Sequence, residues 1–429
     1  MITIGKFADN DQISQYNLVE GNVLTSDAYN CHAGIGVRGL QTRYNIIRNN
    51  TVYNLRRFLG CANIYWNLIE HNMAYNHGHN HFSEEAGTRR ANTIQALGYY
   101  NIFRFNMFFE HENTGRNSKG VDGIQTHSGT YNDIPRGVQY HKIYHNIIWR
   151  HSAQGIAIFH WNNEEKLDDN VYKNNIICHN GNVPELEFVY QVYYNFPNGT
   201  TPWLPTDIWD GNLIMKENNG QVVISFGNRG DFTLDAAKTM FPDIFLSKNI
   251  EGDPQFTDVD SHDFRLQANS PGIDAGVFLT HTMGSGSGTS FQVDDAGYFV
   301  DGCGLIEGDL IQLEGQTQAA RVAAVDYAND IITLDRNITW NTGDGVSLAY
   351  TGSAPDIGAF EYQSAAVLAG DLNHDGKVNI QDVQLCVNVI LGTETNSEIV
   401  AKADVNDDGE INVLDLQAIV SICCGSKFA

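Results

Sequence analysis

An asparagine-centred phrase recurs through the first 215 residues and constrains the fold more than any other feature of the chain. Its copies read YNLVEGNVL from Tyr16, YNIIRNNTV from Tyr44, WNLIEHNMA from Trp66 and NIFRFNMFF from Asn101, with further copies from Lys142, Asn170 and Trp209. The second asparagine of the phrase falls at positions 22, 50, 72, 106, 146, 175 and 212, so the gaps between copies run from 22 to 40 residues. A minimum near 22 residues with variable additions is typical of stacked coils that carry loop insertions.

Within each copy the apolar residues recur about every second position, which predicts short strands with one buried face. A second short strand recurs inside the units as GIGV at Gly34, TIQA at Thr93, GIQT at Gly123, GIAI at Gly155 and VVIS at Val222. Two or three short strands per coil, stacked coil on coil, make a parallel β-helix. Asparagine amides can hydrogen-bond along a stack, and asparagine tolerates left-handed turns. We therefore expect an asparagine ladder, and its spacing favours this over asparagines recurring at unstacked solvent turns.

The repeat resembles the right-handed parallel β-helix proteins of the pectate-lyase-like superfamily, over about residues 10–276. The segment 253–276 is similar to the final coil of many secreted β-helix proteins, in which SPGIDAG leads quickly to a closing DIGAFEY. Here that closing phrase stands about 80 residues later, within 354–362. The resemblance implies a mainly β fold in which 1–276 and 354–362 form the right-handed solenoid and 277–353 is an insert.

The insert 277–353 alternates apolar and polar residues, as in DLIQLEG and DIITLD, which predicts a small antiparallel β module. Such a module could bind a ligand or cap the end of the solenoid. We expect capping, because an uncovered terminal coil is a sticky edge. The preceding stretch 232–241 predicts a short helix.

Charge and composition exclude several classes of protein. The chain has 51 acidic and 26 basic residues and a net charge of −25, so binding to nucleic acid is not expected. No run of 18 apolar residues exists, so no membrane span is expected. The N-terminus lacks the basic and apolar regions of a signal peptide and enters the repeat almost at once, which suggests a mature form or a fragment lacking upstream coils. Acidic excess favours an extracellular or cell-surface location.

The seven cysteines do not form a disulfide scaffold. At most, a bridge joins Cys386 to Cys423 or Cys424. Free buried thiols are the favoured interpretation.

Two twelve-residue loops near the C-terminus have the pattern of calcium sites: DLNHDGKVNIQD from Asp371 and DVNDDGEINVLD from Asp404, 33 residues later. Oxygen ligands at positions 1, 3 and 5, glycine at 6, a backbone carbonyl at 7 and a carboxylate at 12 fit a hard seven-coordinate cation. The candidate ligands are Asp371, Asn373, Asp375, Lys377, Asp382, Asp404, Asn406, Asp408, Glu410 and Asp415, with Lys377 and Glu410 acting through their carbonyls. A helix is expected after each loop, over 383–391 and 416–423, and none before the first.

Paired loops with aspartate at position 12, each followed by a helix, resemble a type I dockerin over about residues 370–424. The resemblance implies that two Ca²⁺ ions fold residues 371–424, that 363–370 is a linker, and that the module binds a cohesin-type domain. Partner choice would be read at loop positions 10 and 11, which are Ile380-Gln381 and Val413-Leu414. These pairs are more apolar than the Ser/Thr pairs of well-known cellulosomal dockerins, which leaves a non-cellulosomal cohesin or intramolecular docking open.

Catalytic groups of a β-helix project outward from adjacent coils, between long loops. Alignment of the second strands places Gly36, Gln95, Gln125 and Ala157 in one outward column and Arg38, Leu97, His127 and Phe159 in the next. Lys119, Asp122 and His127 then lie near one another. Uronate lyases need a base to abstract the proton α to a carboxylate and a cation to stabilise the enolate. His127 or Lys119 could be that base, and Asp122 could orient it or hold a cation; a hydrogen-bonded rung surface is an equally weighted alternative.

Other candidates lie on the flanking insertions. His160 is a further candidate catalytic residue, and Arg38, Gln125, Trp161 and Trp203 are candidate substrate-binding residues, since aromatic faces stack on sugar rings. His77, His79 and His81 alternate along an extended segment before two glutamates, as metal-binding imidazoles do, although a solvated His-rich loop is the favoured interpretation.

The sequence thus predicts a secreted carbohydrate-active protein, a polysaccharide lyase or glycoside hydrolase tethered through a dockerin. The signature phrases of polygalacturonase-like hydrolases, alginate epimerases and chondroitinase-type lyases are absent, so the reaction stays open. An acidic body also repels polyanionic glycans unless calcium bridges them. The alternatives are a non-catalytic structural component that self-assembles through stacked coils, and a glycan-binding protein without turnover.

Overall fold

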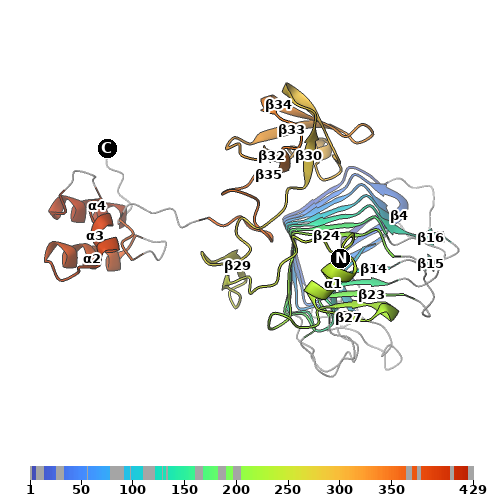
Figure 1. Cartoon of the computed structure of the whole chain (residues 1–429), viewed down its shortest axis with the longest axis horizontal. Helices are drawn as coiled ribbons and strands as arrows, with labels where there is room; N and C mark the ends of the chain where they lie inside the picture. The colour runs from blue at the N-terminus through green and yellow to red at the C-terminus, as the bar shows by residue number, and fades with distance from the viewer. Residues whose placement is uncertain are drawn as a thin grey trace. The chain divides into compact units, whose positions relative to one another are not determined.

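The computed structural model divides the chain into two compact units, Met1–Tyr362 and Gln363–Ala429 (Figure 1). It describes residues 2–5, 14–25, 33–55, 57–77, 91–96, 98–109, 121–127, 129–131, 134–159, 168–181, 190–196, 204–363, 370–373, 378–405 and 410–423. Among these residues, no helix is long and apolar enough to cross a bilayer.

Three sheets of stacked parallel strands run along the first unit, which confirms the predicted parallel β-helix (Figure 1). Sheet A contains β1 (Ile2–Ile4), β4 (Ile35–Arg43), β7 (Leu59–Tyr65), β10 (Ala91–Ala96), β11 (Gly98–Tyr99), β14 (Val121–His127), β17 (Val138–Gln139), β20 (Ile156–Phe159), β23 (Val192–Asn195), β26 (Ile224–Phe226) and the antiparallel β27 (Asp231–Phe232). Sheet B contains β2 (Leu18–Glu20), β5 (Ile46–Arg48), β8 (Leu68–Glu70), β12 (Ile102–Arg104), β18 (Lys142–Tyr144), β21 (Val171–Lys173) and β24 (Ile208–Asp210). Sheet C contains β3 (Val23–Leu24), β6 (Thr51–Tyr53), β9 (Met73–Tyr75), β13 (Met107–Phe109), β19 (Ile147–Trp149), β22 (Ile176–Cys178) and β25 (Leu213–Met215).

The predicted second strands correspond to β4, β10, β14, β20 and β26, all in sheet A. The register places Ile94 beside Ile124 and Ile124 beside Ile156, as the alignment requires. Two strands between them were not predicted. β7 lies between β4 and β10 and pairs Leu59 with both Ile35 and Ile94. β23 lies between β20 and β26 and pairs Val192 with both Ile156 and Ile224. A small antiparallel hairpin of β15 (Gly129–Tyr131) and β16 (Ile134–Arg136) follows β14.

The asparagine ladder is confirmed. In each pair of adjacent coils, the backbone N–H and the side-chain amide of one asparagine both donate to the Oδ1 of the next, at 2.9–3.1 Å. The ladder runs through Asn22, Asn50, Asn72, Asn106, Asn146, Asn175, Asn212 and Asn249. Because each amide also satisfies neighbouring backbone carbonyls, it pairs polar groups that would otherwise be buried at the corner without a partner.

A second ladder lies five residues upstream of the first, and at two of its positions a histidine or an aspartate accepts the hydrogen bond in place of an asparagine. It runs through Asn17, Asn45, Asn67, Asn101, His141, Asn170 and Asp207. Burial lowers the pKa of His141 to about 3, so its Nδ1 is free to accept the Asn101 N–H. Burial also raises the pKa of Asp207 to about 7, although hydrogen bonds from Asn170 and Tyr194 favour its charged form.

Left-handed backbone occurs at the residue before each ladder asparagine as far as Asn212, not at the asparagine itself. Along the upstream ladder, the preceding residues have φ values between 54° and 61°. They are Tyr16, Tyr44, Trp66, Tyr100, Tyr140 and Asp169. Large side chains seldom adopt this conformation. Stacking of the rings offsets part of the energetic cost of this backbone conformation. The ring centroids of Tyr16 and Tyr44 are 5.5 Å apart, and that of Tyr100 lies 4.4 Å from Trp66 and 4.8 Å from Tyr140.

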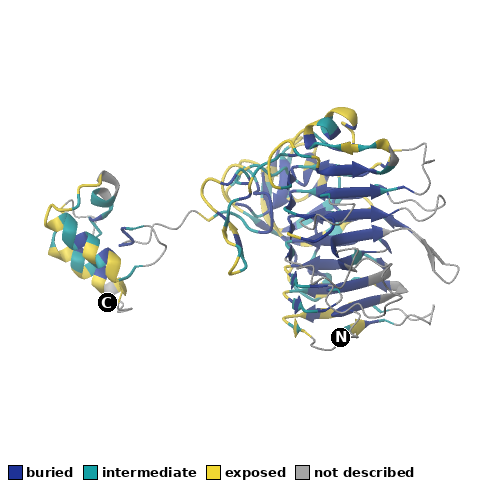
Figure 2. Ribbon diagram, turned by 90° about the horizontal axis from the view of Figure 1, so that it is seen from below, coloured by how far each residue is buried: buried dark blue, intermediate teal, exposed yellow. Residues whose placement is uncertain are grey.

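The solenoid interior is filled by one file of apolar side chains from each sheet, and Figure 2 shows its strands mostly buried. One end is covered by the predicted helix, observed as α1 (Leu234–Met240), which Thr233 caps by accepting the Ala236 N–H. Leu234, Ala237 and Phe245 are buried in the same core.

The insert 277–353 forms a closed antiparallel barrel of six strands. These are β30 (Thr280–Met283), β31 (Gly286–Val293), β32 (Leu310–Leu313), β33 (Ala320–Asp326), β34 (Ile331–Trp340) and β35 (Gly345–Leu348). We expected the barrel to cap the end of the solenoid, but it does not. It packs on the outward face of sheet B, because that face presents Ile46, Leu68 and Ile102 and α1 already covers the end.

A buried ion-pair network fixes the barrel to sheet B. The Arg104 guanidinium donates to Glu70 on the neighbouring coil at 2.8 Å and to both oxygens of Asp309 on the barrel at 2.5 and 2.8 Å. Burial disfavours the Arg104 charge, but the charge of Asp309 outweighs it and raises the pKa of Arg104. Lys142 pairs with Asp295 at 2.5 Å, and the Tyr144 hydroxyl donates to the Tyr298 carbonyl at 2.6 Å.

The outward face of sheet C is covered by the closing segment and by a hairpin of β28 (Phe256–Asp258) and β29 (Asp263–Leu266). Phe264 lies 4.7 Å from Phe109, and the Gly358 N–H donates to the Asn174 carbonyl at 2.8 Å. Gly358 has a φ of 108°, and a Cβ there would stand 2.7 Å from the Ile176 side chain, so the phrase requires glycine at this position.

The second unit contains α2 (Ile380–Ile390), α3 (Ser397–Lys402) and α4 (Val413–Cys423) around a core of Leu372, Cys386, Ala403 and Ile419. Helices α2 and α4 begin three residues earlier than predicted. The reason is that Asn379 caps α2 while Asp382 accepts the Asn379 N–H, so loop positions 10–12 are already helical. Cys178, Cys303, Cys386 and Cys423 are free, which excludes a bridge between Cys386 and Cys423. The predicted linker lies mostly outside the described residues.

The ladder predicts that interior rungs contribute more to stability than terminal ones. Replacing Asn72 by leucine leaves several buried backbone groups unpaired and should lower the free energy of unfolding by about 3–5 kcal/mol. Asn22→Leu, at the half-buried end of the same ladder, should cost about 1 kcal/mol. Urea unfolding followed by circular dichroism measures both values, and equal losses would contradict the ladder as the source of stability.

Candidate functional sites

Sheet A is the face of the solenoid that neither the barrel nor the closing segment covers. Its outward column reads Gly36, Gly60, Gln95, Gln125, Ala157, Tyr193 and Ser225 by strand register. Side chains bond along this column: the Arg57 guanidinium donates to Gln95, and the Asn92 amide donates to Gln125. Farther along, Tyr193 stacks with Tyr190 and contacts the edge of Phe159, and these rings form a small cluster.

Two of the predicted site residues on sheet A have described side chains. Asp122 is fully buried beside Asn92, and its Oδ1 accepts the Gln154 N–H at 3.2 Å. Gln125 is buried at 8% exposure and accepts from Asn92. Asp122 therefore links its coil to the next coil through the Gln154 N–H, and Gln125 belongs to the outward polar column.

The other predicted residues of this site are placed only in part. His127 and Arg38 lie on β14 and β4, where their backbones pair with Phe159 and Ala62, but their side chains are outside the described residues. Lys119, His160, Trp161 and Trp203 lie outside the described residues altogether. Their proposed roles remain predictions.

The histidine cluster is described only at its first member. His77 is buried, and its Nδ1 lies 3.2 Å from the Leu55 carbonyl oxygen. His79 and His81 fall outside the described residues. Within the ranges that the structure describes, no group of three or more histidine, cysteine, aspartate or glutamate side chains is placed to hold a metal.

The two C-terminal loops close on their last carboxylate in the same way. Asp382 is fully buried, and its Oδ1 accepts the Leu372 N–H at 2.8 Å while its Oδ2 accepts the Asn379 N–H at 2.8 Å. Asp415 repeats this with Val405 and Asn412 at the same distances. The position-12 carboxylates thus fold back over the start of each loop, against the position-1 residues Asp371 and Asp404 that precede Leu372 and Val405.

This donor set fits calcium. Asp371, Asp382 and Asp415 are buried carboxylates, and burial of negative charge is costly without a compensating cation. Asn373 and Glu410 are described beside them, whereas Asp375, Lys377, Asn406 and Asp408 lie outside the described residues. Oxygen ligands alone select a hard cation.

Apolar side chains are exposed where each of these helices begins. Ile380 is 72% exposed at the start of α2, and Val413 and Leu414 are 58% and 52% exposed at the start of α4. These are the residues at loop positions 10 and 11. The described residues of the second unit leave them uncovered, as expected of a surface that meets a partner.

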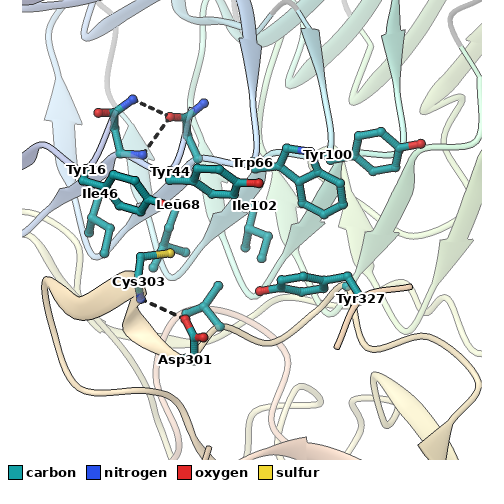
Figure 3. A pocket seen from close by; sticks show the side chains of 14 residues that line it. Tyr16, Tyr44, Ile46, Trp66, Leu68, Tyr100, Ile102, Asp301, Cys303 and Tyr327 are labelled. Carbon is teal, nitrogen blue, oxygen red and sulfur yellow. Dashed lines mark hydrogen bonds between the residues drawn. The ribbon is translucent and has the colours of Figure 1, made fainter. Parts of the chain in front are cut away.

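A cleft between the solenoid and the barrel was not predicted from the sequence (Figure 3). It has a volume of about 330 Å³. One wall is the row of left-handed aromatic residues, namely Tyr16, Tyr44, Trp66 and Tyr100, and the floor is formed by Ile46, Leu68 and Ile102 of sheet B. Barrel residues Val300, Asp301, Cys303 and Tyr327 form the opposite wall. The sequence feature that could have indicated this cleft is the aromatic residue directly before the first asparagine of the repeat, as in Tyr16-Asn17, Tyr44-Asn45 and Trp66-Asn67.

Comparison with known proteins identifies the second unit. Residues 369–421 match the family model of the dockerin type I domain, and the solenoid and the barrel lie outside that match. A comparison of the chain with curated proteins finds no match. Type I dockerin domains typically bind calcium and attach their chains to cohesins outside the cell. The C-terminal unit therefore contains a type I dockerin domain, which implies a cohesin partner and an extracellular setting for the chain.

Proposed function

We propose that this chain is a carbohydrate-active β-helix protein of the pectate-lyase-like type, a polysaccharide lyase or glycoside hydrolase held in a cohesin-based assembly by its dockerin. The observation that carries the proposal is the joining of a type I dockerin domain to a parallel solenoid whose sheet A is covered by neither the barrel nor the closing segment among the described residues. Long chain segments leave the ends of sheet A, and loops on a rigid scaffold commonly build binding and catalytic sites.

The reaction is assigned to sheet A by elimination among the faces. The barrel packs on sheet B and the closing segment covers sheet C, whereas sheet A carries the polar column around Gln125. On this face His127 or Lys119 would act as the base, with His160 as a further acid–base candidate. Arg38, Gln125, Trp161 and Trp203 would hold the glycan, and Asp122 would order the strand on which His127 stands.

The dockerin would take two calcium ions. Asp371, Asn373, Asp375, the Lys377 carbonyl and Asp382 would ligate the first ion, and Asp404, Asn406, Asp408, the Glu410 carbonyl and Asp415 would ligate the second. The buried carboxylates of each loop support this assignment. The ions would neutralise these carboxylates and so stabilise the packing of α2 against α4.

The first test concerns calcium. Asp371→Ala combined with Asp404→Ala should make the dockerin sensitive to protease in calcium, to the extent that a chelator does for the unchanged chain, because the buried carboxylates lose their cation. The solenoid should stay resistant, since it belongs to a separate compact unit. Asp260→Ala, an exposed aspartate of the first unit, is the control for charge. A C-terminal digestion pattern that does not change with chelator would contradict the assignment.

The second test concerns the cohesin. Changing Ile380, Val413 and Leu414 together to serine should weaken binding to the best cohesin of a panel about 100-fold, since loss of their burial removes about 3 kcal/mol. Met240→Ser, on α1 of the other unit, changes a similarly exposed apolar residue and should have no effect. Surface plasmon resonance in calcium gives both constants. Equal affinity of the triple variant would place the contact elsewhere.

The third test concerns catalysis. The full chain should release new reducing ends, or unsaturated uronate absorbance, from at least one member of a panel of neutral and uronate-containing polysaccharides. His127→Ala should lower that rate about 100-fold or more, as loss of an acid–base group does. His281→Ala, an exposed barrel histidine, is the control and should keep full activity. Absence of products from every polymer would replace the enzyme by a glycan-binding or structural component.

A further inference from the structure

We propose that the cleft between the solenoid and the barrel is a binding site for an uncharged saccharide, distinct from the reaction face on sheet A. The proposal rests on the proposed function in taking the ligand to be a glycan. It goes further in naming the place and the charge of what binds. Most small-molecule sites are concave, mainly apolar, lined by few polar groups and located between structural modules, and this cleft has each of these properties.

The cleft is preformed, because buried contacts and ion pairs hold the barrel against sheet B. Arg104, Lys142 and Lys173 fix it over the middle coils through Asp309, Asp295 and the Leu279 carbonyl. On the earlier coils, Ile46 and Leu68 pack into the same buried cluster as the barrel, and the cleft lies between the aromatic row beside them and the barrel residues Val300, Asp301 and Cys303. Trp66 and Tyr327, 5.3 Å apart, touch across the two walls. A rigid cleft loses little entropy when it binds a ligand.

The lining matches the two-sided chemistry of a sugar ring. Ile46, Leu68 and Ile102 form the almost completely buried aliphatic base of the cleft, so the C–H face of a pyranose meets the partly exposed aromatic row beside them. The phenol groups of Tyr16 and Tyr100 belong to half-exposed side chains, at 49% and 39% exposure, and can donate to or accept from sugar hydroxyls. The rings of this row stack on one another, so the edges and hydroxyl groups of the inner rings are what they present to a ligand.

The charge of the lining selects a neutral ligand. Among the described lining residues none is lysine or arginine, and Asp301 is the one carboxylate. Its Oδ1 accepts the Cys303 N–H at 2.9 Å, which leaves Oδ2 to accept from a sugar hydroxyl. A uronate would meet that negative charge with no described cation in the cleft to offset it.

The backbone around Asp301 is unusual in a way that fits a site. Gly302, Cys303 and Gly304 follow one another in left-handed conformation, with φ values of 81°, 52° and 71°. The non-glycine Cys303 is strained there, and such strain is concentrated at functional sites. The turn fixes the Asp301 carboxylate through the Cys303 N–H, in the barrel wall that lines the cleft (Figure 3).

The test is calorimetry on the full chain in calcium, with cellohexaose, xylohexaose and mannohexaose as neutral probes and hexagalacturonate as the charged probe. At least one neutral probe should bind, and more tightly than hexagalacturonate. Tyr16→Ala should raise its Kd about three- to tenfold, and Asp301→Asn, which keeps the bond to Cys303, should raise it about tenfold. Tyr140→Ala is the matched control: Tyr140 stacks on the same row and is similarly exposed, but it does not line the cleft, so Kd should stay unchanged.

Cys303 provides a second measurement that needs no variant. It is half-buried in the cleft, and burial raises its thiol pKa to about 11, so its alkylation is slow and reports access. The bound neutral probe should slow alkylation of Cys303 severalfold, read by peptide mass spectrometry, and leave that of the exposed dockerin residue Cys423 unchanged. This measurement decides the matter if Tyr16→Ala fails to fold.

The proposal is overturned if no neutral probe binds, if hexagalacturonate binds better, if Tyr140→Ala weakens binding as much as Tyr16→Ala, or if Cys303 is not protected. These results are separable from those of the proposed function. Loss of turnover in His127→Ala with binding intact would leave the cleft standing, and turnover without saccharide binding at the cleft would remove the cleft alone.

Discussion

The hydrogen bond from one asparagine amide to the next determines the shape of the first unit. Each ladder asparagine closes a corner of its coil and presents its Oδ1 to the coil before it, so the coils stack in one register. The apolar files and the outward columns follow from that register, because side chains alternate between the two faces of a strand. Where the upstream ladder replaces asparagine by His141 or Asp207, the replacement still accepts the hydrogen bond of its neighbour.

The stacked wall distributes the functions of the chain over its three faces. Sheet C is closed by the returning chain, which crosses at Gly358, and sheet B carries the barrel through Arg104. Sheet A remains for the proposed chemistry. The barrel insertion therefore does more than lengthen the chain: beside its contact with sheet B it forms a cleft with the aromatic row, whose lining includes one carboxylate and, among the described residues, neither lysine nor arginine. The dockerin, a separate compact unit, needs only its calcium loops and its own small core.

The sequence predicts what local residue identity encodes. Asparagines in fixed phase encode the ladder, and the oxygen-bearing residues of each loop encode the dockerin. It does not predict β7, because LGCANIY lacks the glycine–isoleucine pattern of the other strands. The position of the barrel on sheet B depends on contacts such as that between Arg104 and Asp309. These residues are 205 positions apart, so no local sequence pattern contains the contact. The starts of α2 and α4 were placed too late because their first residues also serve as loop positions. The register confirms the column of Gly36, Gln95, Gln125 and Ala157 and pairs His127 with Phe159, but the chemistry of the sheet A site remains a proposal.

Amide hydrogen exchange tests the central claim most directly. If the ladder unites the coils, the backbone N–H groups of Asn50, Asn72, Asn106, Asn146 and Asn175 should exchange slowest in the chain and at a common rate, since they open only when the stack opens. The dockerin amides should exchange independently and respond to calcium. Ladder amides that exchange as quickly as those of surface turns, or each at its own rate, would contradict a cooperative stack.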